Sequence, residues 1–219
     1  MGQGVLVVFE GIDGSGKSTQ RDMLATWLNM QGIACVSLAQ PSGSLAGRVL
    51  RAAIQAQQRL SPVTELALFV RDRREQARFV ITPLLRQGMV VLLDRHYLSS
   101  VAYQGALGLD PEEILRTCEK FSPVADVTFL FDIEPTVALT RIRTIRAADP
   151  FERTEYLIRV RELYLAWASR VPHVVVIDAA HDPQSIQLEL REVVGRLLSA
   201  RGLTSEDSRP RPVGDPPNL

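Results

Sequence analysis

The stretch that most constrains the fold of this chain is residues 11–18, with the sequence Gly-Ile-Asp-Gly-Ser-Gly-Lys-Ser. It follows an apolar run at residues 5–9 and precedes a segment with helical periodicity. Glycines at such a junction let the backbone turn sharply and point its N–H groups at phosphate oxygens, and the positive end of the following helix dipole faces the same anion. Lys17 can then reach the β- and γ-phosphates, and Ser18 offers a hydroxyl ligand for Mg²⁺. The octapeptide therefore predicts a P-loop that binds a nucleotide.

Short apolar runs alternate with amphipathic segments along the rest of the chain. This alternation predicts an α/β fold, with a five-stranded parallel sheet flanked by helices on both faces. The expected strands are residues 5–9, 33–38, 89–93, 127–131 and 173–177. The expected helices are residues 19–31, 45–58, 64–87, 111–120, 136–143, 155–169 and 183–200.

Composition limits the kinds of partner that this chain can have. It has 219 residues, 46% of them hydrophobic, and a formal net charge of +0, so no bulk field attracts nucleic acid or an anionic membrane. No apolar segment approaches the ~20 residues that span a bilayer, and no leader pattern is visible, so we expect a cytoplasmic protein with small-molecule partners. Residues 1–202 are expected to form one domain, and the polar, proline-rich residues 203–219 a disordered tail.

A second polar cluster follows the third expected strand, where the sequence reads Leu-Leu-Asp-Arg-His-Tyr. Asp94 and Arg95 would lie at the carboxyl edge of the sheet, where open α/β folds bind ligands. The Arg95 guanidinium could bind a phosphate with two hydrogen bonds. Asp94 could belong to the Mg²⁺ shell, orient that arginine, or form a strand-terminal salt bridge. The Asn-Lys-x-Asp segment expected of a GTPase is absent from the sequence.

Several separate motifs, spread over roughly residues 4–200, together resemble thymidylate kinases, which have the P-loop kinase fold. They are the P-loop with its embedded Asp13 at residues 9–20, Thr-Glu-Leu-Ala-Leu-Phe-Val-Arg-Asp-Arg at 64–73, Asp-Arg-His-Tyr-Leu-Ser-Ser-Val-Ala-Tyr-Gln at 94–104, Phe-Asp-Ile-Glu-Pro at 131–135 and Val-Ile-Asp-Ala at 176–179. The segment at 94–104 is the most specific of these, because its ending is much less generic than a P-loop.

The resemblance implies transfer of the γ-phosphoryl group of ATP to dTMP, with Mg²⁺ as cofactor and a homodimer as the assembly. Catalysis then consists of aligning the oxygens and neutralising charge, because the acceptor phosphate is already ionised and needs no general base. Ser18 and Asp94 are the expected metal ligands. The residues expected to bind ATP are Gly11, Asp13, Gly14, Ser15, Gly16, Lys17, Ser18 and Thr19.

The resemblance also implies a pocket for the acceptor nucleotide. Phe69 would stack on the base and Arg73 would donate to a base carbonyl, which separates thymine from cytosine. Tyr103 and Gln104 would complete the pocket around base and sugar. On the sugar-phosphate side, the Asp13 carboxylate would accept a hydrogen bond from the 3′-hydroxyl, and Arg95 would hold the monophosphate.

Catalytic arginines are expected from a lid near residues 141–154. Thymidylate kinases place an arginine over the reacting phosphates either from the P-loop or from a lid, and here the residue after Asp13 is Gly14. The candidates in this chain are Arg143, Arg146 and Arg153, which together with Lys17 and Arg95 make up the expected catalytic set.

Three departures from the family pattern keep other functions open. Gln40 stands where an acid is usual, the lid reads Asp-Pro-Phe-Glu at residues 149–152 instead of Asp-Arg-Phe-Glu, and His96 replaces an aromatic residue. Two alternatives follow: a kinase for another nucleoside monophosphate, or a protein that binds ATP without turning it over. The intact Lys17 and Arg95 favour catalysis over the second alternative.

Overall fold

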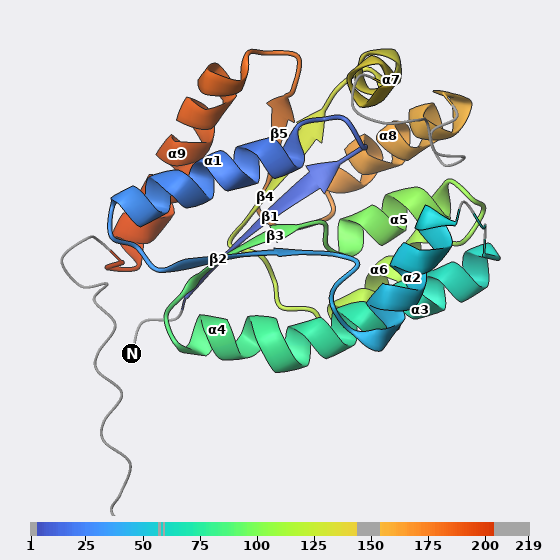
Figure 1. Ribbon diagram of the computed structural model, residues 1–219, viewed down its shortest axis with the longest axis horizontal. Coiled ribbons are helices and arrows are strands. Elements are labelled where there is room, and N and C mark those ends of the chain that lie inside the picture. Colours follow the sequence, from blue (N-terminus) through green and yellow to red (C-terminus); the bar gives the residue numbers. More distant parts are fainter. Residues whose placement is uncertain (1–3, 57, 59, 144–153, 204–219) are drawn as a thin grey trace, which may run out of the picture.

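The computed structural model describes residues 4–56, 58, 60–143 and 154–203, and Figure 1 shows the arrangement of their helices and strands. In chain order the elements are β1 (Val5–Gly11), α1 (Lys17–Met30), β2 (Cys35–Ala39), α2 (Leu45–Gln55), α3 (Pro62–Gln76), the π-helix η1 (Ala77–Ile81), α4 (Thr82–Arg86), β3 (Val90–Asp94), α5 (Tyr97–Gly105), α6 (Pro111–Glu119), β4 (Val127–Asp132), α7 (Pro135–Arg143), α8 (Thr154–Ala168), β5 (Val174–Asp178) and α9 (Pro183–Ala200).

The strands form one five-stranded sheet in the order β2-β3-β1-β4-β5, with every neighbouring pair parallel. This confirms the predicted α/β fold. β1 is the central strand, and Phe9 pairs with Asp94 of β3 while Gly11 pairs with Phe131 of β4. The carboxyl ends of β1 and β3 therefore meet at one edge of the sheet, where the loops that follow them can share a ligand.

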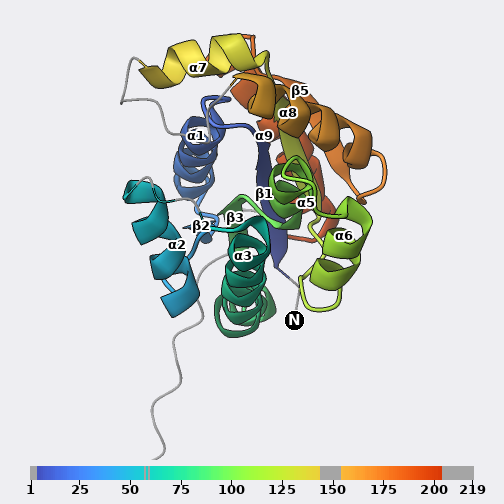
Figure 2. The ribbon, with the colours of Figure 1, turned by 90° about the vertical axis from the view of Figure 1, so that its right-hand side faces the viewer.

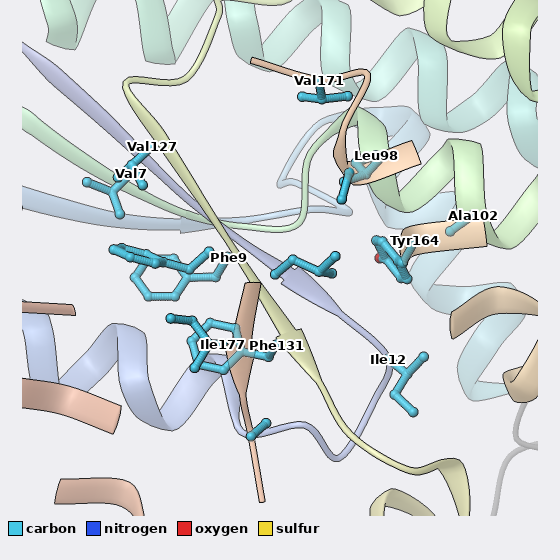
Figure 3. Packing of buried hydrophobic residues seen from close by; sticks show 14 of the residues in the cluster. Val7, Phe9, Ile12, Leu98, Ala102, Val127, Phe131, Tyr164, Val171 and Ile177 are labelled. Atoms are coloured by element: carbon cyan, nitrogen blue, oxygen red, sulfur yellow. The ribbon is translucent and has the colours of Figure 1, made fainter. Parts of the chain in front are cut away.

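Helices cover both faces of the sheet. α1 and α9 pack together on one face, and α4, α5 and α8 contact strands on the other, as the two perpendicular views show (Figures 1 and 2). The residues of β1 and β3 are fully buried between these layers. Inside the core, the rings of Phe9 and Phe131 stack with their centroids 6.1 Å apart, and Figure 3 shows this packing next to Ile177. β2 and β5 lie at the sheet edges and are only partly buried.

The structure corrects one helix that was predicted as continuous, residues 64–87. α3 ends at Gln76, five residues of π-helix follow, and α4 then runs from Thr82 to Arg86. Pro83 explains the break, because its nitrogen carries no hydrogen to bond the carbonyl four residues earlier, and the backbone relaxes into wider turns before it. The predicted helix over residues 45–58 is also too long, since α2 ends at Gln55.

The structure adds one helix that the periodicity did not predict, α5 (Tyr97–Gly105). Its N-cap residue His96 makes no side-chain cap bond, so the usual sequence signal for a helix start is missing. The carboxylate of Glu10, distant in sequence, instead accepts hydrogen bonds from the backbone N–H groups of His96 and Ser99, at 2.8 and 3.1 Å. A helix cap that comes from a distant strand, here β1, cannot be recognised from the residues next to the helix start in the sequence.

Some predicted features lie outside the described residues. These are most of the expected lid and, apart from Leu203, the expected tail at residues 203–219. Within the part of the chain that the structure describes, no helix is both long and apolar enough to cross a membrane.

Candidate active site

The predicted P-loop joins the end of β1 to the start of α1. Three of its glycines adopt positive φ angles, 137° at Gly11, 79° at Gly14 and 93° at Gly16, and α1 begins at Lys17. The N-terminus of α1 therefore points its free N–H groups into the cavity above the loop. Of the residues that were predicted to bind ATP, those from Asp13 to Thr19 line this cavity, and Gly11 does not.

Position 14 has no room for a side chain. A Cβ atom on Gly14 would lie 2.4 Å from the carbonyl oxygen of Ala138 in α7, and 3.1 Å from Ile142. The φ of 79° is also one that residues with a Cβ rarely adopt. The packing of α7 against the loop therefore excludes an arginine at this position.

Lys17 is buried at the floor of the cavity. It is 6% exposed, and its Nζ donates to the Ile12 carbonyl oxygen at 2.9 Å. Burial, and to a lesser extent the positive charge of Arg95, lower the pKa of Lys17 to about 8. In the absence of a bound anion, this ammonium group therefore stays mostly protonated at neutral pH and begins to lose its proton just above it.

The two predicted metal ligands lie side by side. The Ser18 hydroxyl donates to Asp94 Oδ2 at 2.6 Å, and Arg21 Nη1 lies 3.8 Å from the same oxygen. A hydroxyl and a carboxylate are hard oxygen ligands, which suit Mg²⁺ bound mainly by waters and phosphates. The described residues contain no cluster of three or more His, Cys, Asp or Glu side chains that would indicate a metal site made by the protein alone.

Arg95 lies at the junction of several elements, directly after β3. Its φ is 69°, and its backbone N–H donates to the Phe9 carbonyl oxygen at 2.9 Å. Nη2 donates to Asp13 Oδ1 at 2.6 Å and to the Tyr103 hydroxyl at 3.2 Å, and the guanidinium lies 4.9 Å from the Tyr103 ring centroid. Nη1 contacts the hydroxyl oxygens of Ser99 and Tyr164. The structure thus brings three of the predicted site residues, Asp13, Arg95 and Tyr103, into direct contact.

Glu10 is a buried acid behind Arg95 that the sequence did not single out. It is fully buried, and its carboxylate accepts hydrogen bonds from the Ser99 and Tyr164 hydroxyls as well as from the start of α5. Burial raises the pKa of Glu10, while the hydrogen bonds from Ser99 and the charge of Arg95 act in the opposite direction. The signal that could have found it is an acid inside an otherwise apolar strand, Val5–Gly11.

A second, more apolar cavity adjoins the first. Phe69 and Tyr103 line it and are only partly buried, so neither is an ordinary core aromatic. Its apolar wall is formed by α2 and the residues after it. Three residues, Asp13, Gln40 and Arg95, line both cavities, so the two cavities meet at these side chains.

Arg73 is more enclosed than the sequence suggested, with only 1% of its surface exposed. Its Nε donates to Gln40 Oε1 at 3.0 Å, its Nη2 to the carbonyl oxygen of His96 and the hydroxyl of Ser100 at 3.0 Å each, and its Nη1 to the sulfur of Cys118 at 3.3 Å. Gln40, the departure noted in the sequence, is thus a neutral partner of this cation. Arg73 still lines the second cavity, but as a fixed part of its wall.

Gln104 also lines the second cavity, and its two polar atoms differ. Nε2 donates to Glu65 Oε1 at 2.6 Å, which fixes the orientation of the amide. Oε1 is buried and has no hydrogen-bond partner among the described residues. A buried carbonyl oxygen without a donor is unfavourable by about 1–3 kcal/mol, so this atom favours a ligand that brings an N–H group.

Asp72, next to Arg73 on α3, holds the residues before α2 by hydrogen bonds. It is fully buried and accepts hydrogen bonds from the Ser42 backbone N–H at 2.8 Å and from the Ser44 hydroxyl at 2.6 Å. Ser44 in turn caps α2 by accepting from the backbone N–H of Gly47. One turn of α3 therefore holds both the Arg73 guanidinium and the start of the helix opposite it.

Most of the predicted lid arginines lie outside the described residues. Arg143 is the last residue of α7, and Arg146 and Arg153 lie outside the described residues. Arg141, also on α7, lines the P-loop cavity and donates to the Ala179 carbonyl oxygen at 3.1 Å.

Known proteins give the family directly. A sequence model described as "Thymidylate kinase" matches residues 9–190. The chain is 38% identical over 197 residues to a "Probable thymidylate kinase" of Archaeoglobus fulgidus, covering 90% of this chain and 98% of that protein. It is 40% identical over 193 residues to a "Thymidylate kinase" of Akkermansia muciniphila, covering 88% and 92%, and 39% identical over 209 residues to one of Xanthomonas campestris, covering 94% and 90%. The chain, with its P-loop and adjoining apolar cavity, belongs to the thymidylate kinase family.

Proposed function

We propose that this protein transfers the γ-phosphoryl group of ATP to dTMP, giving ADP and dTDP. The observation that carries the proposal is that the P-loop cavity and the apolar cavity meet at Asp13, Gln40 and Arg95. In a chain of this family, the first cavity suits a triphosphate and the second a pyrimidine nucleotide. A donor phosphate above Lys17 and an acceptor phosphate beside Arg95 would then approach each other in line.

On the donor side, the P-loop supplies most of the phosphate contacts. The N–H groups at the start of α1 and the ammonium group of Lys17 would neutralise the charge that spreads over the transferring group. Ser18 and Asp94 would hold Mg²⁺, which would supply positive charge to neutralise the phosphates of ATP. The 2.6 Å contact between the Ser18 hydroxyl and the Asp94 carboxylate supports this assignment.

On the acceptor side, the partly buried ring of Phe69 offers a face for the base. The free Gln104 Oε1 suits the N–H group of a pyrimidine ring, and Arg73 gives the wall a fixed positive charge suited to a carbonyl oxygen. Asp13 would accept a hydrogen bond from the sugar hydroxyl. Arg95 would exchange part of its contact with Asp13 for the acceptor phosphate.

The homodimer and the cytoplasmic location belong to the same proposal. The family to which the chain belongs supports both. Size-exclusion chromatography with light scattering tests the dimer, and fractionation of source cells tests the location.

A coupled ADP-release assay with a panel of nucleoside monophosphates tests the proposed function. We expect turnover with dTMP to exceed turnover with dCMP, dAMP and dGMP. A different preferred monophosphate would identify a kinase of other specificity. Tight ATP binding without ADP release on any acceptor would instead identify a non-catalytic nucleotide-binding protein.

The Michaelis constant for ATP should depend on pH through Lys17. Because burial lowers the pKa of Lys17 to about 8 in the free protein, the group is charged below that pH and neutral above it. Only the charged form should bind the phosphates well, so the KM for ATP should rise by about tenfold between pH 7.5 and 9. A Lys17→Arg variant, whose side chain stays charged, should show a flatter profile. An ATP KM that does not change over this range in the parent protein would contradict the prediction.

At least one lid arginine should act mainly on turnover. Position 14 has no room for an arginine, so the charge over the reacting phosphates is expected from Arg143, Arg146 or Arg153. The corresponding alanine variant should lower kcat more than it raises KM, as expected when a contact forms mainly in the transition state. We expect the largest loss of kcat for the Arg146 variant and the next largest for the Arg143 variant. If no single variant loses more than about threefold in kcat at saturating ATP, which is under 1 kcal/mol, the lid only covers the site.

A further inference from the structure

The orientation of two hydroxyl groups decides whether Arg95 is held in place. Nη1 of Arg95 lies 3.1 Å from Ser99 Oγ and 3.4 Å from the Tyr164 hydroxyl oxygen. A guanidinium can only donate hydrogen bonds, so both oxygens must turn their lone pairs toward it. Each hydroxyl has a single hydrogen, which must then point away from Arg95. Something on the far side of the two hydroxyls has to accept these hydrogens.

Glu10 lies on that far side. Its Oε2 accepts from Ser99 Oγ at 2.5 Å and from the Tyr164 hydroxyl at 3.0 Å, and the two hydroxyl oxygens are 2.8 Å apart. The Tyr164 hydrogen can reach the carboxylate directly or through Ser99. Both routes draw the hydrogens toward Glu10 and leave lone pairs facing Arg95.

The remaining oxygen of Glu10 is also occupied by donors. Oε1 accepts from the backbone N–H groups of His96 and Ser99, so four donors meet this one fully buried carboxylate. An amide at the same place would bring N–H hydrogens against neighbours that are themselves donors. The hydroxyls would then have to reverse, and their hydrogens would point at the Arg95 guanidinium.

We propose that Glu10 is a positioning residue for the acceptor phosphate, because it sets the direction of the Ser99 and Tyr164 hydroxyls and thereby holds the Arg95 guanidinium at the junction of the two cavities. This rests on the proposed function. Glu10 lines neither cavity, so it acts only through its neighbours. The backbone contacts of the same carboxylate, at the start of α5, place Arg95 from its main-chain side as well.

A double-mutant cycle between Glu10 and Arg95 separates positioning from mere support of the fold. Glu10→Gln keeps the shape and should lower kcat/KM for dTMP by about 30-fold, with the KM for ATP changed by less than about twofold. Combined with Arg95→Lys, the same substitution should cost less than about threefold, because the guanidinium that Glu10 positions is already gone. An equal loss in both backgrounds overturns the proposal, since Glu10 would then act independently of Arg95. Calorimetric titration of dTMP gives the same comparison without turnover.

A tyrosine pair on α8 provides a second test that holds even if Glu10→Gln does not fold. Tyr164 and Tyr156 are both buried. The Tyr164 hydroxyl donates to Glu10, whereas the Tyr156 hydroxyl donates to the Tyr103 carbonyl oxygen at 3.0 Å and forms no hydrogen bond with Glu10 or Arg95, two of the described residues. Tyr164→Phe should weaken dTMP binding by about fivefold and Tyr156→Phe by less than about twofold, at similar losses of Tm. Equal weakening by both variants overturns the proposal.

Assays of the parent protein separate a failure of the proposed function from a failure of the role proposed for Glu10. If it does not phosphorylate dTMP, the proposed function fails before any variant is made. If it does, and the Glu10 and Tyr164 variants keep parental dTMP binding, only the role of Glu10 is wrong.

Discussion

Replacing Lys17 by alanine is expected to lower kcat by about 150-fold or more while the protein stays folded. The ammonium group interacts most strongly with the phosphates as charge develops in the transition state, and removing such a contact costs about 3 kcal/mol. Within the part of the chain that the structure describes, the side chain makes one hydrogen bond, to the Ile12 carbonyl oxygen, so the fold loses little. Steady-state kinetics with dTMP measure the loss of kcat, and thermal unfolding of the variant shows whether the fold is retained.

The chain contains a matched control for this variant, because its only other lysine is Lys120. Lys120 is the exposed C-cap residue of α6 and lines neither of the two cavities. Lys120→Ala should keep parental kcat and Tm. Turnover of Lys17→Ala within about fivefold of the parent would rule out the P-loop mechanism.

Replacing Arg73 by alanine is expected to affect stability and base selection together. Arg73 is 1% exposed, and the loss of its guanidinium leaves the Gln40 amide oxygen and the His96 carbonyl oxygen without this donor. Unfolding free energy should fall by about 3 kcal/mol or more, measured by denaturant titration. The preference for dTMP over dCMP, as a ratio of kcat/KM, should fall by about tenfold because the wall loses its fixed donor.

Arg71, two residues earlier on α3, is the matched control. Its side chain is 63% exposed and forms a surface ion pair with Glu75, which contributes little to stability. Arg71→Ala should therefore change unfolding free energy by less than about 0.5 kcal/mol and leave the substrate ratio unaltered. If Arg73→Ala destabilises the protein but keeps the parental ratio, Arg73 is structural and base selection lies with other residues.

The strands of this protein are predictable because their apolar runs are local signals. The central strands β1, β3 and β4 are buried continuously, and each was predicted to within one or two residues at its ends. The helix α5 was missed for the opposite reason, since its start is capped by Glu10 from β1, and no residue near His96 reveals this. The break before Pro83 was also missed, because a proline near the end of a long periodic segment does not indicate which turns will widen.

The sequence motifs of the candidate site were predictable, but the hydrogen bonds that join them were not. The P-loop and the Asp94–Arg95 pair are compact motifs, and in the structure the Ser18 hydroxyl donates to Asp94 and the Arg95 guanidinium donates to Asp13. The sequence could not show which hydrogen-bond donor of the site pairs with which acceptor. That Arg73 gives most of its hydrogen bonds to the protein depends on contacts between segments 23 to 45 positions apart.

The carbonyl oxygen of Ala138 also limits how this protein could evolve. A codon change that introduces arginine at position 14 would drive its Cβ to 2.4 Å from that oxygen, at a φ of 79°. An arginine at position 14 is thus closed to a single step here, because α7 would have to shift first. Related chains that keep this packing of α7 against the loop should therefore keep glycine at position 14.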